Sequence, residues 1–227
     1  MININPFFQL SEFLPPIAMQ IFVITMIILV IIGTLLDMIH KKNVKYFFQN
    51  AKKAKEQAKK TLTKNEKTVI IAKTITNEIL TTSELGLGKR RMAHLLGMYG
   101  TIIFWVTSVI MIFYYADEAI TPIYYTILWH VGALMTCIGG YWFWFFLRVD
   151  VSAEAHPWYR IIQADLFVLS LVITSTLALI WSFFQSNQIV GWDLFFFGLF
   201  VLSNITLFGG VYWSKFAHMF YKPGAAI

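Results

Sequence analysis

Cysteine and charge are both scarce in this chain. Cys137 is the single cysteine among 227 residues. One thiol excludes a disulfide framework and a cysteine-ligated iron–sulfur cluster within the chain, so any iron–sulfur centre must belong to a partner. Charged residues make up only 13% of the chain, which is about half of what a soluble domain carries. The low charge excludes an ordinary soluble globular protein.

Nucleotide-binding and targeting motifs are also lacking. The sequence contains no Walker loop, dinucleotide fingerprint, internal repeat or low-complexity tract. No lysine or arginine precedes the first hydrophobic run, whereas a cleavable signal peptide begins with a basic region. We therefore expect the first hydrophobic run to be retained.

The chain is rich in long hydrophobic runs. Hydrophobic residues make up 58% of it, and the mean hydropathy is +0.64. A helix needs about 20 apolar residues to cross a hydrocarbon layer of about 30 Å. Five runs reach that length, at residues 17–38, 92–115, 122–147, 158–184 and 194–213. The sequence thus predicts an all-α fold, an integral membrane bundle of five helices.

Basic residues divide the loops into two sides. All but four of the 18 lysines and arginines lie within residues 41–91, and the others are Arg148, Arg160, Lys215 and Lys222. The segment before the first span and the turns after the second and fourth spans contain none. Because basic loops stay in the cytoplasm, we expect an outer N-terminus and a cytoplasmic C-terminus in a multi-pass protein of the inner (cytoplasmic) cell membrane. The net charge of +6 then reflects topology and indicates no nucleic-acid binding.

Two of the five histidines are expected at matching depths near the cytoplasmic side. His94 lies four residues after Arg90 in the second span, and His218 lies four residues before Lys222 at the end of the fifth. Two axial histidines commonly hold the iron of a b-type haem, so His94 and His218 are candidate ligands of one haem b. Arg90, Arg91 and Lys222 lie on the aqueous side of both, where haem propionates need cations. The alternative is two unrelated histidines.

Other polar residues allow more than one interpretation. His130 lies about 20 Å from the level of the candidate ligands, at about 1.5 Å per residue, so it cannot ligate the same iron. It either hydrogen-bonds a neighbouring helix or contacts a quinone carbonyl. Asp165 and Lys215 are expected at the inner ends of spans, where they pair with each other, bind propionates or line an inner quinone pocket. His40 and His156 lie at the interface, where histidine is usually solvated or hydrogen-bonded.

Residues 41–91 form the one sizeable segment outside the predicted spans. Residues 44–62 place apolar side chains at helical spacing among lysines, which favours a helix on an anionic lipid surface over a helix that docks a protein. A second helix is expected over residues 66–80, followed by a glycine-containing break at residues 85–88. Two helices exceed what a connection requires, so we interpret this loop as a platform for a soluble redox partner. The chain then divides into residues 1–40, with the N-terminus and first span, the loop, and a four-span haem-binding bundle at residues 92–227.

Four motifs, taken in order, resemble the gamma-subunit superfamily of respiratory nitrate reductase, five-helix cytochromes b that exchange electrons with quinone. The motifs are residues 89–94 (KRRMAH), 136–140 (TCIGG), 163–171 (QADLFVLSL) and 214–219 (SKFAHM). In that family, four histidines on the second and fifth helices hold two haems. His94 and His218 match the cytoplasmic pair, whereas Phe104 and Phe200 stand where the outer pair is expected. The resemblance therefore implies a single haem b.

Two further stretches are most similar to the membrane anchor of adenylylsulfate reductase, namely residues 37–48 (DMIHKKNVKYFF) and 84–91 (ELGLGKRR). This similarity implies a cytoplasmic flavin and iron–sulfur partner that oxidises sulfite, with quinone as electron acceptor. The expected function is that of a membrane-anchoring electron-transfer subunit without a catalytic site of its own. The alternatives are a haem-free membrane anchor, a gamma-type quinol-oxidising subunit of another respiratory reductase, and a small transporter using Asp165, His130 and Lys215.

Overall fold

Every regular element in the described part of the chain is helical. The computed structural model describes residues 3–40, 49, 53, 56, 63–86, 88–116, 120–148 and 159–213. Five helices in these ranges are long and apolar enough to span a membrane. They are α2 (Pro16–His40), α5 (Lys89–Tyr114), α6 (Ile123–Trp142) with its π-helical continuation η3 (Phe143–Leu147), α8 (Leu166–Ser186) and α9 (Trp192–Gly209). The predicted all-α five-helix membrane bundle is confirmed, while its orientation stays a prediction.

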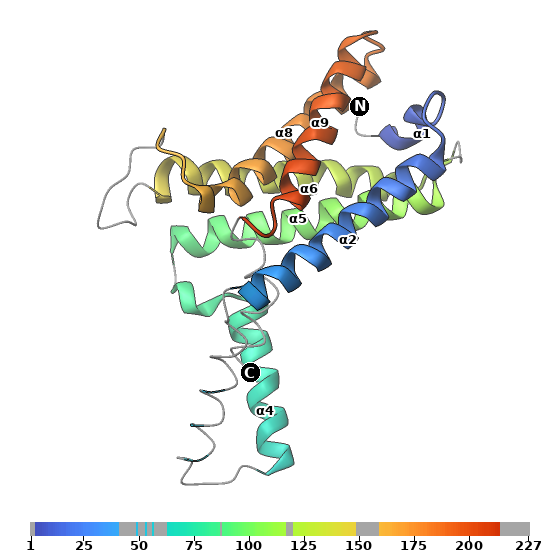
Figure 1. Cartoon of the computed structure of the whole chain (residues 1–227). Helices are drawn as coiled ribbons and strands as arrows, with labels where there is room; N and C mark the ends of the chain where they lie inside the picture. Colours follow the sequence, from blue (N-terminus) through green and yellow to red (C-terminus); the bar gives the residue numbers. More distant parts are fainter. Residues whose placement is uncertain are drawn as a thin grey trace.

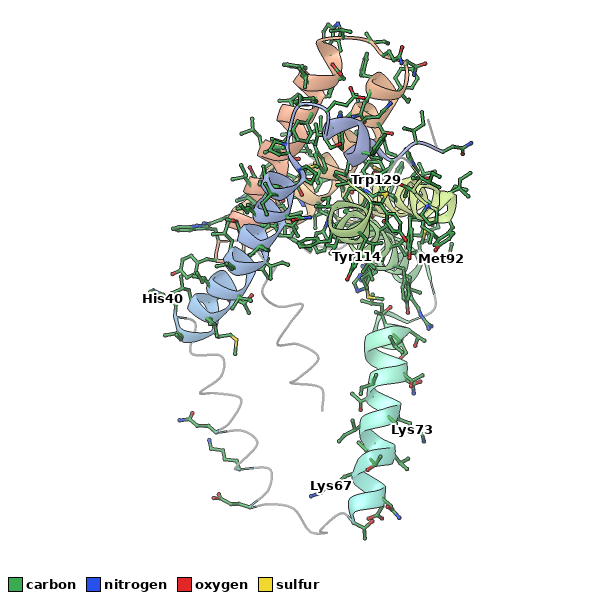
Figure 2. All side chains as sticks on the ribbon, turned by 90° about the vertical axis from the view of Figure 1, so that its right-hand side faces the viewer. His40, Lys67, Lys73, Met92, Tyr114 and Trp129 are labelled. Atoms are coloured by element: carbon green, nitrogen blue, oxygen red, sulfur yellow. The ribbon has the colours of Figure 1, made fainter. Side chains whose placement is uncertain are left out.

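The helices pack in chain order, with the first on the outside. α5 lies against α6, α6 against α8, and α8 against α9, while α2 lies against α9 and α5 (Figure 1). Figure 2 shows α2 inclined away from α5, with His40 and Met92 on opposite sides of the view. Most of the isoleucines and leucines of α2 are exposed in the protein alone, as is expected for a helix whose outer face contacts lipid.

The connections define two ends of the bundle. The α1 end carries the short helix α1 (Pro6–Leu10), the start of α2 and the turns that join α5 to α6 and α8 to α9. The α4 end carries the last turn of α2, the helix α4 (Lys64–Thr74), the start of α5 and the 3₁₀ turn η4 (Gln163–Asp165) before α8. Every lysine and arginine of the described ranges lies at the α4 end or in the loop attached to it. This separation of charge is what the sequence analysis predicted.

Small residues allow α5 and α6 to approach closely. A Cβ atom added to Gly132 would lie 2.7 Å from the backbone nitrogen of Phe104, and one added to Gly139 would lie 2.5 Å from that of Gly97. Backbone atoms cannot move aside as a flexible side chain can, so these two glycines have no substitute at this spacing. The contact fixes α5, which carries His94, firmly against α6.

The loop helix begins where its capping residues place it. The Thr63 hydroxyl accepts a hydrogen bond from the Glu66 backbone, and the Glu66 carboxylate accepts one from the Thr63 backbone. This capping box starts α4 at Lys64, two residues before the predicted position. The π-helix η1 (Ile75–Leu80) completes the predicted helix to residue 80, and the predicted break follows, with Gly86 at φ +68°. The other loop helix, predicted at residues 44–62, lies mostly outside the described residues.

Two span boundaries differ from their predictions by more than three residues. The fourth span begins at Leu166, not at residue 158, because the η4 turn and the polar contacts of Asp165 precede it. The fifth helix ends at Gly209 and not at residue 213, because the Gly209–Gly210 pair breaks the helix and a turn follows. The chain between η3 and η4 lies largely outside the described residues.

Candidate functional site at the α4 end

His94 lies in the second turn of α5. Its side chain is exposed, whereas the preceding Ala93 is buried and packs its carbonyl against Gly139. A Cβ atom added to Gly97, one turn later, would meet nothing within 4 Å. The surface around His94 therefore has room for a flat group beside the imidazole.

A ring contact sets the register of α5 against α9. The ring centroids of Trp105 in α5 and Phe208 in α9 are 5.0 Å apart. His94 lies 11 residues before Trp105, which is about three helical turns, so both side chains share one face of α5. His218 follows Phe208 by 10 residues and lies outside the described residues, beyond the end of α9. Since α5 and α9 are antiparallel, the start of α5, which carries His94, and the end of α9 both lie toward the α4 end.

The two arginines before His94 differ in their surroundings. The Nε of Arg91 donates a hydrogen bond of 2.7 Å to the Thr81 carbonyl, and the Tyr99 hydroxyl donates one of 2.8 Å to the Leu80 carbonyl. These bonds fasten the end of η1 to α5, a role that the sequence analysis missed. Arg90 is exposed and is the more accessible cation for an anionic group near His94.

Asp165 lies at the start of α8 and is paired with Arg148 at the end of η3. The Nε of Arg148 donates a 3.2 Å hydrogen bond to Oδ1 of Asp165, and its Nη2 donates to Oδ2. Nη2 also donates to the Arg160 carbonyl, and the guanidinium lies 4.3 Å from the Trp144 ring centroid. The Asp165 carboxylate also accepts a hydrogen bond from the Ile162 backbone. A charged fork of this kind fixes the geometry where η3 meets α8.

The sequence analysis missed this pair because 17 residues separate its members. The available signal was that both lie at the ends of successive spans on the basic side of the protein. Of the seven candidate site residues, the structure describes His94, Arg90, Arg91 and Asp165. The remaining three, His218, Lys215 and Lys222, lie outside the described residues, as does the interfacial His156.

An open pocket of about 270 Å³ lies where the end of α2, the turn η4 and the turn that follows α9 meet. Its lining residues are His40, Gln163, Tyr212 and Trp213. The rings of His40 and Tyr212 meet edge to face, with centroids 5.9 Å apart. The sequence analysis gave His40 only an ordinary interfacial role, because nothing in the sequence placed the turn after α9 beside it.

Asp37 lies one turn before His40 and has no exposed surface. One turn earlier, Gly33 approaches the same turn after α9, since a Cβ atom added there would lie 2.9 Å from Cβ of Val211. The α2 face that carries Gly33, Asp37 and His40 therefore packs against the chain that follows α9. An acidic residue within a hydrophobic run was the signal for this position, because membrane helices retain such groups mainly at functional or paired sites.

Phe104 and Phe200, the two positions where the resemblance leads us to expect an outer ligand pair, lie in an aromatic core at the α1 end. Phe104 contacts Trp129 with ring centroids 5.2 Å apart, and Phe200 stacks on Trp181 at 5.5 Å. Phe7 of α1 meets both tryptophans edge-on. Trp129, labelled in Figure 2, and Trp181 are 0% and 1% exposed. Aromatic side chains fill this end of the bundle.

His130 bridges α6 and α8 at the α1 end. Its Nδ1 lies 2.7 Å from the Thr126 carbonyl and its Nε2 lies 2.8 Å from the Ser182 hydroxyl. A carbonyl can only accept, so Nδ1 carries the proton, and a neutral ring then accepts from Ser182. The predicted hydrogen bond to a neighbouring helix is confirmed, and both ring nitrogens already have partners.

Comparisons of the chain with protein-family models, with curated proteins and with solved structures find no match. The described residues also contain no group of three or more histidine, cysteine, aspartate or glutamate side chains that could hold a metal ion. A haem held by two histidines needs no such group, and one of its two candidate ligands lies outside the described residues.

Proposed function

We propose that the protein is a membrane-anchoring cytochrome b subunit that passes electrons between a cytoplasmic enzyme and the quinone pool. One haem b is held at the α4 end by His94 and His218. The observation that supports this most is the setting of His94, which has an exposed imidazole, open space beside Gly97 and a place on the α5 face that meets α9.

The residues around His94 suit a haem and its propionates. A haem with two histidine ligands supplies one-electron transfer and no bond-making step of its own. Arg90 and Lys222 are the proposed partners of the propionates, and Lys215 lies seven residues before Lys222 in the chain. Asp165, which is bound to Arg148, is assigned to the structure of the site rather than to the propionates.

The packing of the α1 end supports one haem rather than two. The positions of the missing ligands are occupied by Phe104 and Phe200, and both rings contact buried tryptophans. Insertion of a second macrocycle would require this aromatic core to be taken apart. Electrons are therefore exchanged at the α4 end, where the quinone site must also lie.

The proposed partner is a soluble flavin and iron–sulfur oxidoreductase, for which adenylylsulfate reductase oxidising sulfite is the best candidate. Its docking surface is the lysine-rich loop, because Arg91 and Tyr99 fasten the end of η1 to the helix that carries His94. Figure 2 shows α4 projecting from the bundle, with Lys67 and Lys73 along it. The proposed docking brings the partner close to His94.

A lipid-surface role is the second candidate for this loop helix. α4 runs across the direction of α5 and α6 (Figure 1) and exposes the apolar side chains of Val69, Ile70 and Ile71, which contact with lipid would remove from water. If the partner docks through opposite charges, Lys67→Glu with Lys73→Glu should weaken its retention on membranes several-fold at low salt. High salt should weaken retention of the wild-type protein's partner as well, because salt screens such attraction. Retention that responds neither to these changes nor to salt would leave the lipid-surface role.

The direct test is a reduced-minus-oxidised absorption spectrum of purified variants. His94→Ala and His218→Ala should each abolish the haem signal while the protein still inserts, and His130→Ala is the matched control that should retain it. Full haem occupancy in either ligand variant would refute the assignment. A wild-type protein without a haem signal would support the haem-free anchor instead.

A further inference from the structure

The hairpin tip, residues 187–195 between α8 and α9, exposes large apolar side chains. Val190 is 88% exposed and Trp192, the first residue of α9, is 54% exposed. Ile189 and Phe195 extend the same exposed surface. Figure 1 shows the tip at the top of the view, apart from the other described helices. A loop that stays in water usually carries polar residues at such positions, so the tip requires another surrounding.

The backbone of the hairpin tip is hydrogen-bonded within the hairpin. The amides of residues 187–191 and 193–195 all donate to acceptors of the hairpin itself. Positive φ angles at Gln188 (+53°) and Gly191 (+89°) turn the chain tightly enough for these bonds. The side-chain amide of Asn187 donates to the Phe183 carbonyl as well. Because the apolar layer of a membrane offers no water to backbone groups, a loop can enter it only when its amides are bonded internally.

The hairpin carries very little charge. Asp193 is the one charged residue between residues 166 and 214. Its Oδ1 accepts hydrogen bonds of 2.9 Å and 2.8 Å from the backbone nitrogens of Gly191 and Leu194. The positive end of the α9 dipole stabilises this carboxylate further. These partners replace water at the carboxylate, and its charge favours a position of the tip at the edge of the apolar layer over one at its centre.

The length of α9 agrees with a tip at that edge. Its 18 residues extend about 27 Å at about 1.5 Å per residue, whereas the hydrocarbon layer is about 30 Å thick. α9 is also inclined to α5 and α6 (Figure 1), and an inclined helix covers less of the thickness. Trp192 at its start therefore lies at the boundary of the layer, where tryptophan is enriched.

We infer that the α8–α9 hairpin tip is embedded in the bilayer, with Ile189, Val190 and Trp192 in contact with lipid acyl chains just inside the headgroup–hydrocarbon boundary. The hairpin then contacts lipid through its tip as well as through its sides. Neither a haem nor a partner enzyme is needed for this contact, and it holds whichever side of the membrane the α1 end faces.

Spin labels at three positions test the inference. Val190→Cys, Leu202→Cys and Glu12→Cys are each made in the full-length Cys137→Ser protein, labelled and reconstituted in liposomes. Leu202, exposed in the middle of α9, is the reference for lipid, and the exposed carboxylate Glu12, before α2, is the reference for water. Oxygen concentrates in lipid, whereas a charge-neutral nickel chelate stays in water. At Val190 we expect nickel collisions several-fold rarer than at Glu12 and oxygen collisions as frequent as at Leu202.

Two results of this measurement would overturn the inference. Nickel collisions as frequent at Val190 as at Glu12 would place the tip in water. Rare collisions with both reagents at Val190 would mean that a second copy of the chain covers the tip.

The wild-type protein provides a test that needs no substitution. It is reconstituted with a phosphatidylcholine that carries a diazirine on its acyl chain, irradiated, and mapped by mass spectrometry. We expect label on residues 187–195 as well as around Leu202. Label around Leu202 without label on the tip would contradict the inference, even if the Cys137→Ser protein fails to fold.

Discussion

The two ends of the bundle carry different kinds of side chain. At the α1 end, tryptophan and phenylalanine rings fill the core, and hydrogen bonds link segments far apart in the chain. Asn5 donates to the Tyr115 carbonyl and to the Thr121 hydroxyl, and Gln185 donates to the Pro6 carbonyl. At the α4 end lie the cations, the exposed His94 and the pocket beside His40. The α1 end is therefore the more tightly packed one, whereas the α4 end presents the groups to which our proposal assigns binding.

Aromatic packing at the α1 end also accounts for how the five helices can pack together there without a bound cofactor. The space between the helices at the α1 end must be filled, because an empty cavity there would cost packing energy. Phe104 fills it with a ring that packs at a tilt against Trp129, and Phe200 with a ring that stacks on Trp181. In the proposed cytochrome b, aromatic packing thus takes the place of a second haem at that end.

A matched pair of tryptophan truncations gives the largest expected effect. Trp181, 1% exposed, contacts Phe200, whereas Trp213 at the α4 end is 59% exposed. Trp181→Ala should lower the free energy of unfolding by about 3–5 kcal/mol, because it removes a large buried ring. Trp213→Ala should change it by at most about 0.5 kcal/mol, as expected for an exposed site. Unfolding titrations in mixed micelles measure both, and equal losses would break the comparison between the ends.

A pair of glycine substitutions tests the contact that holds α5 in place. Gly139→Ala pushes a methyl group onto the Gly97 backbone, so it should destabilise the protein by about 1–3 kcal/mol. Gly198→Ala, in the middle of α9, meets nothing within 4 Å and should be neutral or stabilising by up to about 1 kcal/mol. The same unfolding titrations measure the free energy of unfolding of both variants. A Gly139→Ala protein as stable as Gly198→Ala would mean that α5 and α6 are less closely packed than described.

The smallest effect concerns the hydrogen bond of His130, which we assign to structure. A double-mutant cycle with His130→Ala and Ser182→Ala should give a coupling free energy of about 0.6 kcal/mol, the usual size for such bonds between membrane helices. Haem content should stay unchanged throughout. A coupling near zero would remove the bridge between α6 and α8, and a loss of haem in either single variant would show that the two ends are not independent.

The sequence predicted the features that depend on local composition. Hydrophobic length located all five spans, the positions of lysine and arginine separated the two ends, and Thr63 with Glu66 marked a helix start that our prediction placed two residues late. The close approach of α5 and α6 was also readable in principle, because Gly132 and Gly139 lie two turns apart on one face of a helix.

Features that depend on contacts between distant segments were not predicted. Arg148 reaches Asp165 only after η3 and α8 are packed, and α1 closes its end only through residues on other helices. The pocket beside His40 exists because the turn after α9 folds against α2. Periodicity and charge counts carry no information on which helix meets which, so these contacts required the structure.

The number of haems per chain tests the central claim most directly. The purified wild-type protein is quantified by amino-acid analysis, and its haem is quantified as the pyridine haemochrome. We predict one haem b per chain, bound at the α4 end by His94 and His218. A ratio near two would contradict the account, because the aromatic core of the α1 end would then have to hold a second group, and a ratio near zero would show that the chain is not an electron carrier.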